Sequence, residues 1–246
     1  MAGGYHIRHN AKPEVIREIL EVIHYNNSSK RDEIKNSLPQ YIKTVIDESI
    51  IIKNKIISNN DIEKLLEMDE ITFNNYLHYK MYSSEEPIGW SYRNVIDILY
   101  NEYCEKKINL QDIEQKVKER ALEEGIENIS FSQNSVRGAL NFISALEPNP
   151  VDDSNVFNLR SYCQPHLMLW GIDYIYNKQW GGEYGSLILL DDEKIEELCK
   201  FAMIDRNNFD SILKQCDMIY NFLEVSTKLF GKSSRLNRKW TFDDIL

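Results

Sequence analysis

The stretch that decides the fold is NLQDIEQKVKERALEEGIENISFSQNSVRGALNFISALEPNP, residues 109–150. It begins with Asn109, a residue type that caps helix N-termini, and apolar residues then recur at helical spacing. Gly125 and Asn128 interrupt the pattern, and Ser132 offers a second cap before another helix. Two capped helices joined by a short turn predict a helix-turn-helix.

The second of these helices has one apolar and one polar face. Its apolar face is formed by Val136, Ala139, Leu140, Ile143 and Leu146. Its polar face presents Gln133, Asn134, Arg137 and Asn141. Asn and Gln can each form two hydrogen bonds with adenine, and Arg can do so with guanine. The same residue types cover exposed helices without a ligand, so the sequence leaves both possibilities open.

The flanking sequence extends this motif into a unit at 83–150 and predicts a similar unit at 1–82. In the first unit, Ile16, Ile19 and Leu20 mark a helix that begins near Pro13, and the following residues predict two further helices and a short strand. Residues 1–9 are expected to be a loose end. Residues 59–81 have helical character but no assigned place in either unit.

A third, looser unit is predicted at 151–246. A helix begins at Pro165, residues 185–190 form a strand, and Asp191 or Asp192 caps a helix. Apolar residues at helical spacing predict a long helix over 207–230, followed by a small hairpin over 231–246. The expected fold is therefore mainly α with short β-hairpin wings, in two to three tandem winged-helix-like units.

In this order of elements the chain resembles tandem winged-helix proteins. The segments that carry the resemblance are SSKRDEIKNSLPQYIKTVIDESIIIKNKIIS (28–58) and NLQDIEQKV with FSQNSVRGALNFI (109–117 and 131–143). It is similar to DNA-binding regulators and accessory proteins of prokaryotic defence systems and mobile elements. It also resembles the kite-type winged-helix subunits of SMC complexes, which bind protein and DNA. The resemblance implies a binding function, and no residue roles are transferred from either family.

The charge distribution restricts how such a protein could bind DNA. The formal net charge is −10, which opposes binding to a polyanion. Residues 61–130 carry eight Lys and Arg against sixteen Asp and Glu, whereas residues 1–60 carry nine against seven. DNA contacts are therefore expected at local patches. The expected contact residues are Lys30, Arg31, Gln40, Lys43, Gln133, Asn134, Arg137, Asn141, Lys232, Arg235, Arg238 and Lys239.

Catalytic patterns are weak, so we expect a protein that is not an enzyme and that needs no cofactor or metal. The four cysteines contain no C-x-x-C pair, and the histidines have no ligand partner at a suitable spacing. Arg160 and His166 have the spacing found in HEPN-type ribonucleases, and such a ribonuclease remains one alternative. Pro165 argues against it, because proline disrupts a helix that would have to continue across both residues.

The partners expected are double-stranded DNA and, as the main alternative, another protein or a second copy of the chain. Aromatic-rich stretches at 73–82 and 170–185 support the alternative, in particular Trp180 and Tyr184, because Tyr and Trp are enriched at protein interfaces. No apolar run approaches the roughly 20 residues that span a bilayer, and no signal peptide is recognisable. We therefore expect a cytoplasmic protein that does not bind membranes.

Overall fold

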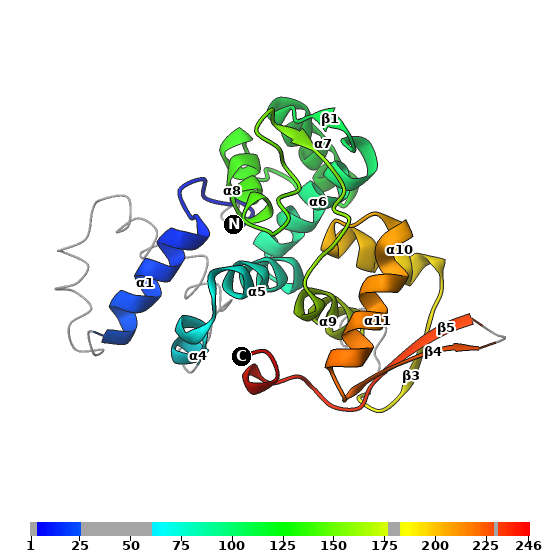
Figure 1. Ribbon diagram of the computed structural model, residues 1–246. Coiled ribbons are helices and arrows are strands. Elements are labelled where there is room, and N and C mark those ends of the chain that lie inside the picture. Colours follow the sequence, from blue (N-terminus) through cyan, green and yellow to red (C-terminus); the bar gives the residue numbers. More distant parts are fainter. Residues whose placement is uncertain (1–3, 26–60, 177–182, 229–230) are drawn as a thin grey trace.

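The computed structural model describes residues 4–25, 61–176, 183–228 and 231–246, and these segments are mainly helical. Two small antiparallel sheets accompany the helices, one of two strands and one of three. The prediction of a mainly α fold with short β elements is confirmed at this level. Figure 1 shows helices from several parts of the chain gathered around α5 (Glu70–Ser83).

Helix α5 occupies the segment that periodicity could not assign, and it is central to the fold. Asp69 caps it by accepting a hydrogen bond of 2.8 Å from the amide of Thr72. Nine of its 14 residues are buried. It packs against α6 (Pro87–Glu102), α8 (Gln133–Ser144), α9 (Pro165–Tyr174) and α1 (Pro13–Tyr25). A helix buried on most sides lacks a single apolar stripe, which is why its sequence shows no clear amphipathic period.

The two helices predicted within 109–150 are present, and residues 124–132 join them. Helix α6 (Pro87–Glu102) precedes α7 (Leu110–Glu123) and α8 (Gln133–Ser144). The Asn109 side chain accepts hydrogen bonds from the first amides of α7, and Ser132 forms a capping box with the third residue of α8. Both caps were predicted from residue type alone, because these side chains satisfy amides that have no partner within the helix.

The turn and the strands around these helices follow the prediction only in part. Gly125 and Asn128 end α7 with positive φ angles of 75° and 57°. Strand β1 (Lys106–Lys107) pairs with β2 (Val156–Phe157). In residues 158–164, all of which are described, no further strand follows β2 to complete a hairpin wing.

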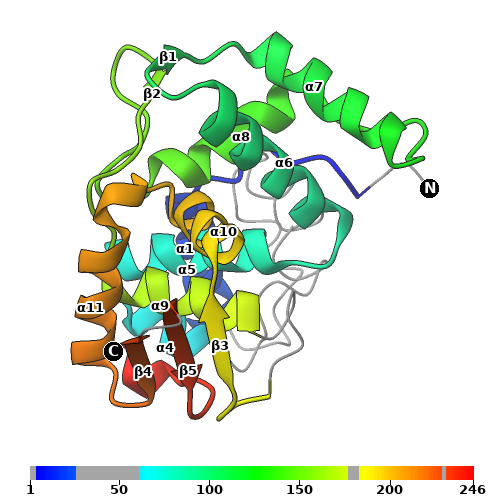
Figure 2. The ribbon, with the colours of Figure 1, turned by 90° about the vertical axis from the view of Figure 1, so that its right-hand side faces the viewer.

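The C-terminal part combines helices with the three-stranded sheet. In chain order it contains α9 (Pro165–Tyr174), β3 (Leu187–Leu190), α10 (Asp192–Ala202), α11 (Phe209–Ile219), β4 (Leu223–Lys228) and β5 (Gly231–Leu236). The sheet has the strand order β3-β5-β4. In Figure 2 its strands lie below α10 and beside α11. The helix start at Pro165, the strand at 187–190 and the Asp191 cap are confirmed.

Two predictions in this region are wrong. The helix predicted over 207–230 ends at Ile219, and residues from Leu223 onward form β4. The segment at 231–246 is not a hairpin: its first part is β5, which pairs with β4 and β3, and a 3₁₀ turn at Phe242–Asp244 follows. β4 pairs with β5, which follows it in the chain, and β5 also pairs with the more distant β3, so the sheet satisfies the backbone and overrides the helical spacing of the apolar residues.

The buried side chains form one cluster that runs from Ile7 to Trp240 and includes residues of all three predicted units. Its largest member is Trp170 on α9, which is fully buried and contacts the rings of Tyr76, Tyr79 and Trp240. The aromatic stretch at 73–82 thus contributes mainly to this core. Division of the chain at residues 82 and 150 stays a prediction.

Candidate nucleic-acid interface

The polar face of α8 carries the four residues predicted to read bases. Asn134 and Arg137 are exposed, and Gln133 and Asn141 are half-buried. The Arg137 guanidinium donates a hydrogen bond of 2.8 Å to the Asn134 side chain one turn earlier. Arg137 is the only charged residue between positions 128 and 146. The face is therefore polar and weakly basic, in a protein that is otherwise acidic.

The N-terminal segment lies along one side of this face. Ile7 is fully buried, and a Cβ atom added to Gly138 would lie 2.5 Å from the Ile7 carbonyl oxygen. His6 Nδ1 lies 2.6 Å from the Ser135 hydroxyl, and the Asn141 amide donates to the His9 carbonyl at 2.6 Å. The expectation of a loose N-terminal end is wrong for residues 4–9, because Gly138 lets this backbone pack directly against α8.

This packing adds basic side chains beside α8. Residues 5–12 contain Arg8, His9 and Lys12 and no acidic residue. His9 and Lys12 are exposed, and Lys12 approaches Glu14 at 3.8 Å, a weak contact between exposed groups. We call residues 5–12 together with the polar face of α8 the α8 patch. The sequence did not predict the contribution of the N-terminal segment, because only contacts in the folded chain, such as that with Gly138, place this segment beside α8.

Substitution of Gly138 with alanine is expected to loosen the N-terminal segment. Alanine normally favours a helix over glycine by about 1 kcal/mol, but here its methyl group would meet the Ile7 backbone. Trypsin should then cleave after Arg8 roughly tenfold faster than in the wild type. Gly125→Ala is the control for destabilisation without this contact, because alanine is strained at its φ of 75° but its Cβ would have no neighbour within 4 Å. Equal acceleration by both substitutions would refute this packing role.

The predicted basic residues near the C-terminus are largely occupied by acidic partners. On β5, Lys232 pairs with Asp210, and Arg235 lies 3.6 Å from Glu224. Arg238 donates two hydrogen bonds, of 2.8 and 2.7 Å, to the Asp244 carboxylate. These hydrogen bonds hold the pKa of Asp244 well below its usual range.

Arg238 also lies over the Phe222 ring, with 4.1 Å between the guanidinium carbon and the ring centre. Lys239 is exposed, and no ion pair with another described residue involves it. The run of cations has no acid within it in the sequence, but strand pairing places Glu224 directly opposite Arg235. The tail therefore offers less positive charge to a ligand than its sequence suggests.

The predicted contact residues do not form one surface. In both views α8 lies in the upper part of the molecule, whereas β5 lies in the lower part (Figures 1 and 2). The residues predicted in the first unit, Lys30, Arg31, Gln40 and Lys43, lie outside the described residues, as does Trp180. Among the predicted contact residues that the structure describes, Gln133, Asn134, Arg137 and Asn141 lie together on α8, and the C-terminal cations form a separate group.

Arg160 and His166, the residues of the ribonuclease alternative, have separate structural contacts. Arg160 is only 3% exposed and precedes α9, and its guanidinium donates to the carbonyl oxygens of Ala202 and Glu147. His166 lies in the first turn of α9, 2.8 Å from the Asn75 side-chain amide, and burial lowers its pKa to about 4. These contacts give no support to a catalytic Arg160–His166 pair.

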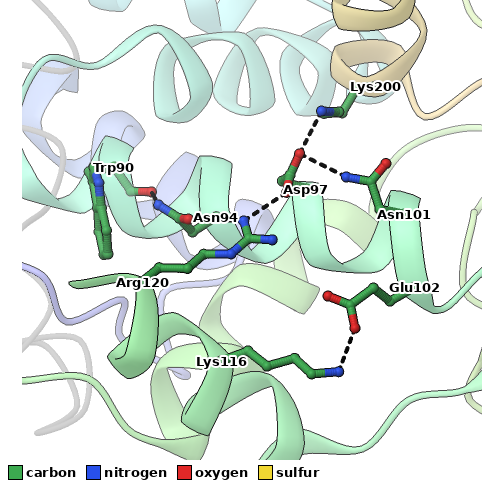
Figure 3. Close-up of polar contacts among 8 residues, drawn as sticks. All are labelled: Trp90, Asn94, Asp97, Asn101, Glu102, Lys116, Arg120 and Lys200. Carbon is green, nitrogen blue, oxygen red and sulfur yellow. Dashed lines mark hydrogen bonds and ion pairs between the residues drawn. The ribbon is translucent and has the colours of Figure 1, made fainter. Parts of the chain in front are cut away.

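A polar network connects α6, α7 and α10 (Figure 3). The Asp97 carboxylate accepts hydrogen bonds from Lys200 at 2.5 Å, Arg120 at 2.7 Å and Asn101 at 3.0 Å. Burial opposes ionisation of Asp97, but the bonds from Lys200 and Arg120 outweigh it and lower the pKa. These contacts occupy the Asp97 carboxylate and connect α6 and α7 with α10. The network therefore offers no open binding site.

The remaining chemistry of the described residues is limited. No group of three or more His, Cys, Asp or Glu side chains among them could hold a metal ion. All four cysteines are free thiols, and burial raises the pKa of Cys163 to about 11. No helix in the described part of the chain is long and apolar enough to cross a bilayer. Comparison with family models, curated proteins and solved structures finds no match to this chain.

Proposed function

We propose that this chain is a non-catalytic DNA-binding protein built from winged-helix-like units and that the α8 patch contacts the duplex. The C-terminal order of helix, strand, helix, helix, strand, strand, with the sheet order β3-β5-β4, supports such a unit. The order α6, β1, α7, α8, β2 is the same as far as the first wing strand. In this arrangement α8 and α11 occupy the position of the recognition helix.

The observation that carries the proposal is the charge of the α8 patch. Arg8, Lys12 and Arg137 lie in two segments that contain no acidic residue, although acidic residues outnumber basic ones by ten in the whole chain. Exposed Asn134 and half-buried Gln133 stand at the N-terminal end of α8, the end from which recognition helices contact bases. Arg8 and Lys12 are placed to hold phosphates beside them.

Helix α11 is less suited to DNA. Its exposed or half-buried positions include Asp210 and Asp217, and its last turn exposes Met218 and Ile219 at 76% and 58%. Carboxylates repel the phosphate backbone, and exposed apolar side chains are more typical of protein interfaces. We therefore assign DNA contact to α8 and not to α11.

Fluorescence anisotropy with labelled duplex DNA tests the proposal. Binding should be detectable at about 50 mM salt and weaken steeply as salt rises. Arg8→Ala with Lys12→Ala should reduce the slope of log affinity against log salt by roughly two. Arg137→Ala should change the preference among duplex sequences by about 1–3 kcal/mol.

Arg206→Ala serves as the control, because Arg206 is an exposed arginine beside α11 that pairs with Asp192. It removes the same formal charge as Arg137→Ala at a position outside the α8 patch and should leave both quantities unchanged. Absence of binding by the wild-type protein at low salt would refute the proposal. A loss in Arg206→Ala as large as that in Arg137→Ala would show that only net charge matters and would equally refute a reading role for α8.

A further inference from the structure

A groove lies between α1, α5 and the C-terminal end of α8. Its volume is about 830 Å³, within the range of ligand-binding clefts. Apolar groups line part of it, among them Pro13, Ile71 and Phe73, and Ile71 is 39% exposed although it is a large apolar residue. The groove involves the end of α8 opposite to Gln133, so it is separate from the proposed reading end.

The polar lining of this groove is strongly acidic. Its carboxylates come from three regions of the chain: Glu14, Glu18 and Glu21 on α1, Glu70 on α5, and Glu147 after α8. The side chains of the last four make no ion pair or hydrogen bond with any residue that the structure describes, and Glu14 only approaches Lys12 at 3.8 Å. The fold thus gathers five carboxylates around one groove without neutralising them.

The one cation among the described lining residues does not offset this charge. Arg17 points its guanidinium at the backbone, donating to the carbonyl oxygens of Leu66 at 3.1 Å and Met68 at 2.7 Å. It also lies over the Phe73 ring, 5.2 Å from the ring centre. These contacts anchor α1 to the segment before α5, so Arg17 serves the fold, and no other cation among the described residues lines the groove.

A mostly buried amide adds a hydrogen-bond acceptor to the lining of the groove. Asn74 lines the groove and is only 8% exposed. Its Nδ2 donates to the Ala145 carbonyl at 3.1 Å, but its amide oxygen accepts no hydrogen bond from any described residue. This oxygen is an acceptor, which suits a donor-rich ligand.

We propose that this groove binds a lysine- or arginine-rich segment of a partner protein. Ammonium or guanidinium groups would pair with the glutamates and donate to Asn74, and the stems or apolar neighbours of such side chains would cover Ile71. The groove and the α8 patch have opposite charge, so they select different partners. This inference goes beyond DNA binding, because it assigns the expected contact with another protein to this groove.

The test uses the full chain and a fluorescein-labelled peptide of alternating arginine and leucine. The wild-type protein should bind this peptide, with affinity that falls as salt rises, and should not bind a glutamate–leucine peptide of the same length. Glu14→Gln with Glu18→Gln and Glu21→Gln should weaken binding about tenfold, since each exposed ion pair contributes a few tenths of a kcal/mol or more. Adding Ile71→Ser should weaken peptide binding further without changing its salt dependence.

The matched control is Glu119→Gln with Glu123→Gln and Glu127→Gln, which removes three exposed glutamates at and beyond the end of α7. It changes the net charge equally and should alter peptide affinity by less than about twofold. Equal weakening by both triple variants would overturn the proposal, because only overall charge would then attract the peptide. Failure of the wild-type protein to bind the arginine–leucine peptide would also overturn the proposal, even if the cause is another segment of this chain that fills the groove. Duplex DNA affinity, measured on the same variants, separates this outcome from failure of the proposed function.

Discussion

Replacement of Arg160 with alanine is expected to destabilise the protein by about 3–5 kcal/mol. The Arg160 guanidinium is buried and donates to two backbone carbonyl oxygens, those of Ala202 and Glu147. Its own backbone pairs with Met203 and Asp205, so the residue holds the end of α10 against the segment that follows α8. Alanine would leave these carbonyl oxygens without donors and create a cavity.

Urea unfolding followed by tryptophan fluorescence measures this change. Arg160→Lys should recover little of the loss, because an ammonium group cannot reproduce the planar set of donors. Arg206→Ala provides the contrast. The Arg206 side chain is about half exposed, and its partner Asp192 is mostly exposed. The expected effect on stability is therefore within about 0.5 kcal/mol. If Arg160→Ala is as mild as Arg206→Ala, the assigned structural role is wrong.

Acidification from pH 6.5 to 5 is expected to destabilise the protein by about 2 kcal/mol through His78 alone. This histidine on α5 is fully buried, with Nδ1 at 2.9 Å from the Tyr92 hydroxyl and Nε2 at 2.9 Å from the Phe201 carbonyl oxygen. Burial lowers its pKa from 6.5 to about 3. His166, whose pKa is lowered to about 4, acts in the same direction.

The sign follows from proton binding. Between about pH 6.5 and pH 3 the unfolded chain holds a proton on His78 that the folded chain does not. Protons therefore favour the unfolded state, and stability is lost as the pH falls below 6.5, by up to about 1.4 kcal/mol per pH unit and per histidine. Asp244 and Asp97, whose pKa values are lowered, lose their contributions only at more acidic pH. The window above pH 5 therefore reports on the histidines.

The free energy of unfolding in urea, measured at several pH values, checks this expectation. His78→Gln keeps a polar side chain but cannot take up a proton, so it should flatten the dependence on pH even if it lowers stability overall. A slope in the His78→Gln variant equal to that of the wild type would contradict the assignment.

Local features of the fold were predictable where neighbouring residues alone determine them. The caps at Asn109, Ser132 and Asp191 and the breaks at Gly125 and Asn128 were predicted from residue type and confirmed. Each depends on hydrogen bonds or φ angles within a few residues. The boundary between α11 and β4 was not predictable in this way, because β4 belongs to a sheet in which its partner β5 also pairs with β3, more than 40 residues earlier in the chain.

The candidate sites show the same limit. The base-reading residue types on α8 were predicted from its polar face, whereas the position of Arg8 and Lys12 depends on contact between Ile7 and Gly138, more than 100 residues apart. The C-terminal cations were predicted as a basic patch, but the fold pairs Lys232, Arg235 and Arg238 with acids. The acidic groove was not foreseen, since its glutamates come from three separate segments.

The sequence by itself determined the class of the fold, the capped helices α7 and α8 and the polar face of α8. These depend on local propensity and periodicity, which residues close in the chain fully specify. The tertiary structure decided which charges are neutralised and which remain, where the N-terminal segment lies, and that α5 is the central helix. Charge pairing and burial are properties of residues that meet in space, so the α8 patch and the acidic groove emerged only from the folded chain.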